Sequence, residues 1–138
     1  MALCSLHVGA VMQWFKRARR TEIWDEPIEW PIGDIEAAKR IRDICNSAAA
    51  SAEKAGAAAN PAHKKVRREV ERYERGARAA MEIAMKVSDE LLRDAAVRQI
   101  VELCLKAGNV TTAQTLFRAI QSKSIQDDVL RDLPQLQP

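Results

Sequence analysis

Residues 34–61 read DIEAAKRIRDICNSAAASAEKAGAAANP, and this stretch decides the fold. Small and apolar residues recur in it at spacings of three and four, the period of one helix face. We expect Asp34 to cap the helix, and Asn60-Pro61 to end it and start another. The repeating positions are Ala38, Ile41, Cys45, Ala48, Ala52, Ala55 and Ala59.

The next segment repeats this pattern, with Val66, Val70, Tyr73, Ala77, Ala80, Ala84 and Val87 on one face. Two helices of about 26 residues each, joined by a corner, predict an antiparallel hairpin over residues 34–87. The alanine seam buries little apolar area, so the hairpin needs further cover. We expect flanking apolar residues to stay partly open and to favour association, including self-association. These flanking residues are Ile44, Met81, Ile83 and Met85.

Residues 88–133 predict a helix pair and a short last helix. Ser88 is the expected cap of a helix over 89–107, whose polar residues fall in one narrow row. Thr111 opens the next helix with a capping box, and Ser124 opens the last one, which Pro134 ends. The polar row is Glu90, Asp94, Arg98, Glu102 and Lys106; the expected core is Leu92, Ile100, Leu103, Leu116 and Phe117.

An internal repeat accompanies this helix pair. The eight residues 87–94 recur in similar form at 125–132, which is typical of helix-pair repeats. Residues 96–121 resemble a tetratricopeptide-type repeat, with 105–108 at its turn and Ala113 and Phe117 in its second helix. Ile100 and Cys104 stand where the family has Leu and Tyr, whereas Val101 departs from its small Gly. The resemblance implies paired helices whose groove binds other proteins or peptides.

Residues 1–33 predict a basic N-terminal segment followed by an extended strap. Pro27 and Pro31 prevent a helix in the strap, and Trp24 and Trp30 are expected to dock on the helical body. The alternative is that these two tryptophans insert into a partner. The predicted organisation is therefore residues 1–33, a helical domain over 34–133 (hairpin 34–87, helix pair 88–133) and a loose tail over 134–138.

Charge is unevenly distributed along the chain. Residues 1–20 contain four bases and no acid, whereas residues 21–38 contain six acids and no base. A second basic cluster follows at 64–68. Such asymmetry indicates either a solvated face or an anionic partner, including a membrane surface for residues 1–20. The candidate anion-binding residues are Lys16, Arg17, Arg19, Arg20, Lys64, Lys65, Arg67 and Arg68.

Composition narrows the class of protein. The chain is 47% apolar and 30% charged with few Gly and Pro, which excludes collagen-like and wholly disordered chains. No apolar run is long enough for a transmembrane helix, and the first residues lack the order of a secretory signal. Three widely spaced cysteines favour a reducing compartment. We expect no catalytic, cofactor or metal site, since no triad, phosphate loop or set of close ligands is present.

These patterns together predict an all-α protein that is no enzyme and needs no cofactor. The leading hypothesis is a cytoplasmic protein–protein interaction or structural module that binds another protein, its own copies, or both. Candidate partner-binding residues are Trp24, Trp30, Met81 and Met85, and a second candidate surface is the groove of the third and fourth predicted helices. The alternative is a protein that binds nucleic acid or an anionic surface through the clusters 16–20 and 64–68.

Overall fold

A computed structural model describes residues 21–138 and confirms an all-α protein, with no β-strand within this range. Within residues 21–138, five α-helices and two short 3₁₀ helices follow one another. In order they are η1 (Ile23–Asp25), α2 (Asp34–Ala57), α3 (Lys64–Ala84), α4 (Glu90–Lys106), α5 (Val110–Phe117), α6 (Lys123–Asp132) and η2 (Pro134–Leu136).

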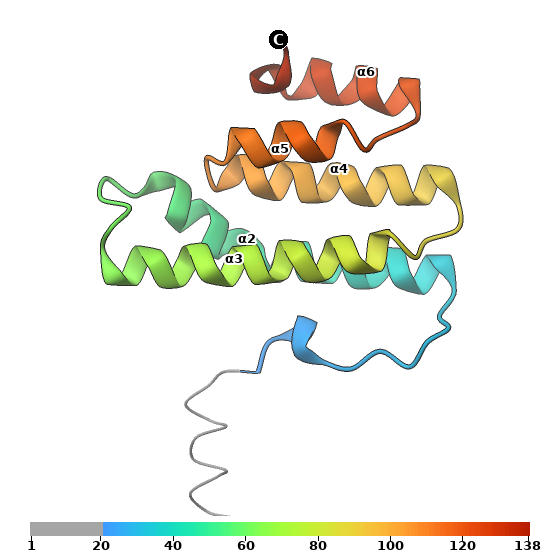
Figure 1. The fold of residues 1–138 in the computed structure, drawn as a ribbon, viewed down its shortest axis with the longest axis horizontal. Coiled ribbons are helices and arrows are strands. Elements are labelled where there is room, and N and C mark those ends of the chain that lie inside the picture. Colours follow the sequence, from blue (N-terminus) through green and yellow to red (C-terminus); the bar gives the residue numbers. More distant parts are fainter. Residues whose placement is uncertain (1–20) are drawn as a thin grey trace, which may run out of the picture.

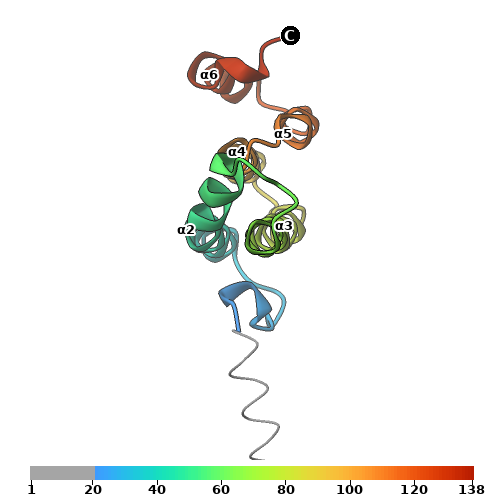
Figure 2. The ribbon, with the colours of Figure 1, turned by 90° about the vertical axis from the view of Figure 1, so that its left-hand side faces the viewer.

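The helices form an open stack of layers (Figures 1 and 2). α2 and α3 lie side by side as the predicted antiparallel hairpin, and α4 packs on both of them. α5 lies against α4, and α6 forms the far end of the stack. The strap, residues 21–33, lies on the opposite side of the hairpin from α4 (Figure 1).

The core lies where α2, α3 and α4 meet. Ile41, Ala48, Ala80, Ile100 and Val101 are each completely buried. Small side chains at the seam let the helices approach closely, as the alanine pattern predicts. Gly56 is required for the same reason, because a Cβ there would collide with the backbone carbonyl oxygen of Lys106 in α4.

The strap supplies cover that the hairpin pattern leaves missing. Ile44 and Ile83, which we expected to stay partly open, are only 4% and 5% exposed. Trp24 and Ile28 of the strap pack against the core and share a surface hollow with these two residues. The prediction of an open strip is therefore wrong for Ile44 and Ile83, because the strap, which lies outside the predicted hairpin, covers them.

Two carboxylates join one layer to the next. Asp34 does not cap its own helix, where Gly33 is the N-cap; it accepts hydrogen bonds from the backbone N–H groups of Ser88 and Asp89, 3.0 and 2.8 Å away. Asp94, a member of the predicted polar row, is completely buried.

Asp94 accepts hydrogen bonds from the backbone N–H groups of Gln121 and Ser122, at 3.2 and 2.7 Å. This polar side chain is buried because α5 and α6 cover α4 on the side away from the hairpin. Arg98 in the same row binds Asp132 of α6 at 2.8 Å. Asp94 and Arg98 therefore connect layers, whereas Glu90 and Lys106 at the two ends of the row are exposed.

Helix ends differ from the sequence pattern by a few residues. α3 begins at Lys64 with His63 as N-cap, because Asn60 accepts from the backbone N–H of Ala62 in a local turn. Asp89, Asn109 and Ser122 are the N-caps of α4, α5 and α6, in place of the expected Ser88, Thr111 and Ser124. Gly108 supports the turn before α5 with a φ of 75°.

Three further expectations are corrected. Leu92, Leu116 and Phe117 are only half-buried at the edge of the core, because α5 is short and one of its faces stays open. The tail is not loose: η2 folds back and Leu136 is buried. The repeated residues 87–94 and 125–132 also differ in register, since the first copy precedes and enters α4 whereas the second lies wholly inside α6.

We predict that Asp94→Ala lowers the free energy of unfolding by about 2–5 kcal/mol, because two backbone N–H groups lose a charged acceptor. Asp94→Asn should cost less, since its amide keeps one oxygen as acceptor. Urea denaturation followed by circular dichroism measures both changes. A parent-like midpoint for Asp94→Ala would show that these hydrogen bonds do not hold α6 in place.

Candidate functional site

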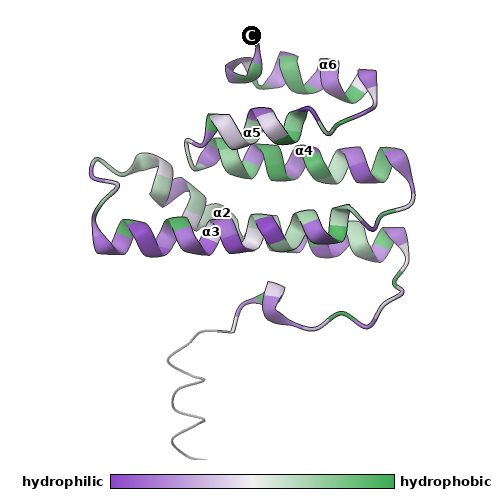
Figure 3. Cartoon of the chain, in the orientation of Figure 1, coloured by the Kyte–Doolittle hydropathy of each residue, from purple (hydrophilic) through white to green (hydrophobic). Residues whose placement is uncertain are grey.

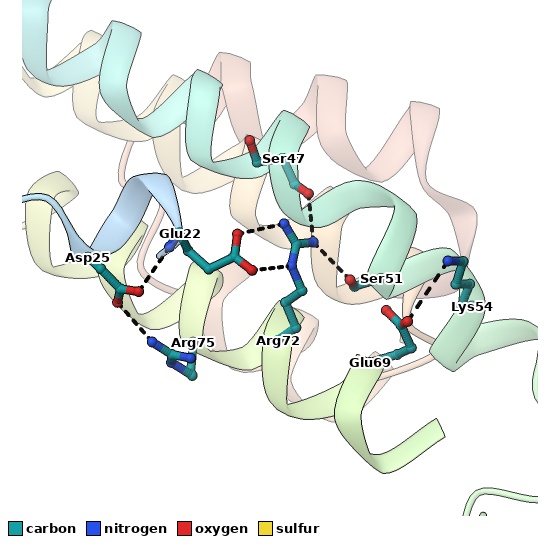
Figure 4. A network of polar contacts seen from close by, with 8 residues as sticks. All are labelled: Glu22, Asp25, Ser47, Ser51, Lys54, Glu69, Arg72 and Arg75. Atoms are coloured by element: carbon teal, nitrogen blue, oxygen red, sulfur yellow. Dashed lines mark hydrogen bonds and ion pairs between the residues drawn. The ribbon is translucent and has the colours of Figure 1, made fainter. Parts of the chain in front are cut away.

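Arg72 of α3 fastens the strap to the hairpin (Figure 4). Its Nε and Nη2 donate to both carboxylate oxygens of Glu22, at 2.7 and 2.9 Å. Its Nη1 donates to the backbone oxygen of Ser47 and to Ser51 Oγ of α2, both at 2.9 Å. One guanidinium therefore connects three segments, and its planar fork suits this bidentate geometry.

Trp24 packs beside this ion pair. Its ring lies over Gly76, where a Cβ would approach Cζ3 to 3.4 Å, and the Arg72 guanidinium carbon lies 5.0 Å from the ring centroid. Trp24 Nε1 is buried and has no hydrogen-bond partner among residues 21–138. Trp24 thus docks on the helical body as expected.

Trp30 differs from Trp24, since its side chain remains at the surface with 39% exposed. Lys86 Nζ lies 4.3 Å from the centroid of its ring. Of the two tryptophans singled out in the sequence, Trp30 is exposed and Trp24 is only partly buried, so Trp30 presents the more accessible side chain.

A groove of about 340 Å³ opens between α3 and α5. Ala77 and Met81 come from α3, Leu116 from α5, and Cys104 at the end of α4 lies between them. Figure 2 shows α3 and α5 on the same side of α4, and the groove lies between these two helices. We call this space the α3–α5 groove.

Polar groups border the α3–α5 groove. Tyr73 accepts a hydrogen bond on its hydroxyl from Asn109 Nδ2, at 3.1 Å, and burial raises the pKa of its phenol. Glu74 and Arg78 lie on the α3 side, whose exposed face is largely hydrophilic (Figure 3), and Thr112 lies on the α5 side. An apolar floor with a polar border is typical of a surface that receives an apolar side chain.

The structure separates the two methionines that the sequence placed together. Met81 is half-buried and lines the α3–α5 groove. Met85 is the C-cap residue of α3, and its side chain is 69% exposed. The sequence pattern suggested a groove between its third and fourth helices, which are α4 and α5 in the structure. The α3–α5 groove instead has α3 and α5 as its walls and the end of α4 at its base.

Two other hollows lie on the described part of the chain. One of about 670 Å³ lies between the strap and α2, and one of about 260 Å³ lies between α2 and α4. Within residues 21–138 no His, Cys, Asp and Glu side chains gather into a metal site. Burial raises the pKa of Cys45 to about 12 and of Cys104 to about 11, so both thiols stay protonated and weakly nucleophilic.

The eight candidate anion-binding residues divide into two groups. Lys64, Lys65, Arg67 and Arg68 are exposed in the first turns of α3 and form no ion pair with any other described residue. Lys16, Arg17, Arg19 and Arg20 lie outside the described residues. In the range that the structure describes, no helix is long and apolar enough to cross a membrane.

Comparison of the chain with family models, with curated proteins and with solved structures gives no match. The function is therefore argued from the geometry of these surfaces.

We predict that docking of the strap weakens in acid. The hydrogen bonds from Arg72 hold the pKa of the Glu22 carboxyl below its ordinary value of 4.5. A lowered folded-state pKa stabilises the docked strap above pH 4.5, and this contribution is lost as the pH falls through the folded-state pKa. Tryptophan fluorescence should therefore change on acidification as Trp24 leaves Gly76.

Glu22→Gln is the matched variant for this titration. It should remove this acid transition and weaken docking by about 1 kcal/mol at neutral pH, because a partly exposed ion pair is lost. Asp25→Asn, which removes the neighbouring pair with Arg75, is the control. An identical transition in Glu22→Gln would show that another group controls docking.

Proposed function

We propose that the protein is a non-enzymatic protein-interaction module that binds a segment of another protein in the α3–α5 groove. The observation that carries the proposal is this open apolar groove on three helices that are fixed by the buried core. Binding surfaces built on packed helices keep their shape and so need little ordering when a partner arrives.

The lining of the groove supports a peptide or helix as partner. Met81 adapts its shape to different side chains, and Leu116 and Ala77 leave room for an apolar anchor between the two helices. Glu74 and Arg78 can pair with charged groups that flank such an anchor. The proposal includes the resemblance of residues 96–121 to a tetratricopeptide-type repeat. This resemblance implies that a groove between helices binds a protein or peptide.

The proposal gives the protein no catalytic role and places it in the cytoplasm. The buried, protonated thiols of Cys45 and Cys104 suit a reducing compartment and offer no nucleophile. Self-association through the helical surfaces is included in the proposal, because a second copy is one partner that the groove can receive.

We predict that Met81→Lys abolishes capture of the partner, since a lysine in the groove blocks its apolar floor with a charge. Met85→Lys is the matched control, because it makes the same change four residues along α3 but outside the groove. The measurement is quantitative affinity capture from the native extract with the parent and both variants, checked by circular dichroism. The proposal requires one protein that the parent and Met85→Lys retain and that Met81→Lys loses by at least about ten-fold.

Retention of the same proteins by all three forms would overturn the groove as the binding surface. Sedimentation of the same three samples tests self-association: the parent and Met85→Lys should sediment above the monomer mass and Met81→Lys as a monomer. A monomeric parent that also captures no protein would contradict the whole proposal.

A second candidate function is binding of nucleic acid or another polyanion through residues 64–68. The four exposed basic side chains in the first turns of α3, unpaired within the described structure, favour it. Electrophoretic assays at low salt should then show binding that weakens steeply with salt, and charge reversal at Lys64 and Arg67 should weaken it further. No shift of a nucleic acid even at low salt would eliminate this candidate.

A further inference from the structure

The hydroxyl of Tyr73 accepts a hydrogen bond at one end of the α3–α5 groove. Tyr73 is only 4% exposed, and both it and Asn109 line the groove. Asn109 is the N-cap of α5 and its Oδ1 accepts from the backbone N–H of Thr112, so its Nδ2 is the atom that donates to the hydroxyl, at 3.1 Å. The hydroxyl oxygen is therefore the acceptor in this pair, and its own hydrogen is free to donate elsewhere.

This hydrogen has no acceptor within the described part of the chain. Among residues 21–138 the one hydrogen bond of the Tyr73 hydroxyl is the bond that it accepts from Asn109. The phenol keeps its hydrogen at neutral pH, because burial raises its pKa above the ordinary value of 10.0. A buried donor without an acceptor costs free energy, and a bound group that accepts from it recovers that cost. Tyr73 thus offers a donor to an occupant of the groove.

Two charges on the border of the groove add to this donor. Glu74 and Arg78 of α3 are both exposed, and neither forms an ion pair within residues 21–138. Glu74 follows Tyr73 in the chain, and Arg78 lies about 6 Å further along the helix axis, at 1.5 Å per residue. An occupant therefore meets a negative charge near the hydroxyl and a positive charge on the side of Met81.

A free backbone carbonyl is the acceptor that suits this donor. Carbonyl groups inside a helix already accept from the N–H group four residues further on, whereas those of an extended segment are unpaired along its whole length. A carboxylate would be a poor acceptor here, because the charge of Glu74 repels it. The donor therefore favours an extended segment over a helix as the occupant.

We infer that the α3–α5 groove binds an extended segment of another protein, one of whose backbone carbonyl groups accepts a hydrogen bond from the Tyr73 hydroxyl. An apolar side chain of the segment lies on Met81 and Leu116. The residue on one side of it is basic and pairs with Glu74, and the residue on the other side is acidic and pairs with Arg78. These two residues are about 6.6 Å apart at 3.3 Å per residue, close to the spacing of the two charges on α3.

This inference rests on the proposed function and adds the conformation and the chemistry of the partner. The probe is a peptide selected on the parent protein from a displayed library of short random peptides. Loss of binding to Met81→Lys identifies the peptides that occupy the groove, and these should carry an apolar residue between a basic and an acidic one. Tyr73→Phe is the test variant, because it keeps the ring and removes only the hydroxyl. Thr112→Val is the matched control, since it removes an exposed hydroxyl from the same border.

Tyr73→Phe should bind the selected peptide about five-fold more weakly than the parent, whereas Thr112→Val should bind it within about two-fold of the parent. Replacement of each peptide amide in turn by an ester then weakens one carbonyl acceptor at a time. One ester should weaken binding to the parent but cause no further loss in Tyr73→Phe. A purely structural effect of the variant does not produce this coupling.

Asn109→Asp is a second variant, which keeps a good N-cap for α5. It replaces the amide donor by a carboxylate that accepts the hydrogen of the Tyr73 hydroxyl. Its binding should therefore also become insensitive to that ester, although the hydroxyl is still present. Circular dichroism checks that the parent and all variants melt alike.

Failure of the inference and failure of the proposed function give different results. If no selected peptide binds the parent and is lost from Met81→Lys, both are overturned. If peptides bind in the groove but no ester shows coupling with Tyr73, the inference alone is overturned. A selected peptide whose nuclear magnetic resonance signals show a helix in the bound state also overturns the inference and leaves the groove as the binding surface.

Discussion

Two carboxylates, each of which accepts two consecutive backbone N–H groups, fasten α4 to α2 and α6 to α4. Asp34 of α2 binds the amides just before α4, and Asp94 of α4 binds those just before α6. Both bind the unpaired donors at a helix start, where a negative charge is most favourable. Because the hairpin buries mainly alanine, these polar connections fix where the upper helices lie, and the alanine seam alone would not.

The position of the open surfaces follows from this arrangement. The strap covers one side of the hairpin through Arg72 and Trp24, and α4 covers the other. α5 is only 8 residues long, so it leaves the α3–α5 groove open along Met81 and Leu116. The groove in which we propose binding thus results from a layer that is too short to complete the packing, and a polar border surrounds it.

Much of the fold could be predicted from the sequence, because the spacing of apolar residues reports directly on helices. The hairpin, the burial of Ile100 and Leu103, and the docking of Trp24 follow from such local patterns. The role of Asp94 could not be predicted: its spacing is that of an exposed row, and only the amides from a distant loop explain its burial. The attachment of the strap through Glu22 and Arg72 was also missed, since these two residues lie 50 positions apart and share no sequence pattern.

The central claim is that Asp94 fixes the segment between α5 and α6 on α4 and so keeps α5, one wall of the α3–α5 groove, in position. Amide hydrogen exchange at Gln121 and Ser122 tests it most directly, because both N–H groups lie outside helices and owe their protection to this carboxylate. The account predicts that both amides exchange as slowly as those inside α4. Exchange at the rate of an exposed loop would contradict it.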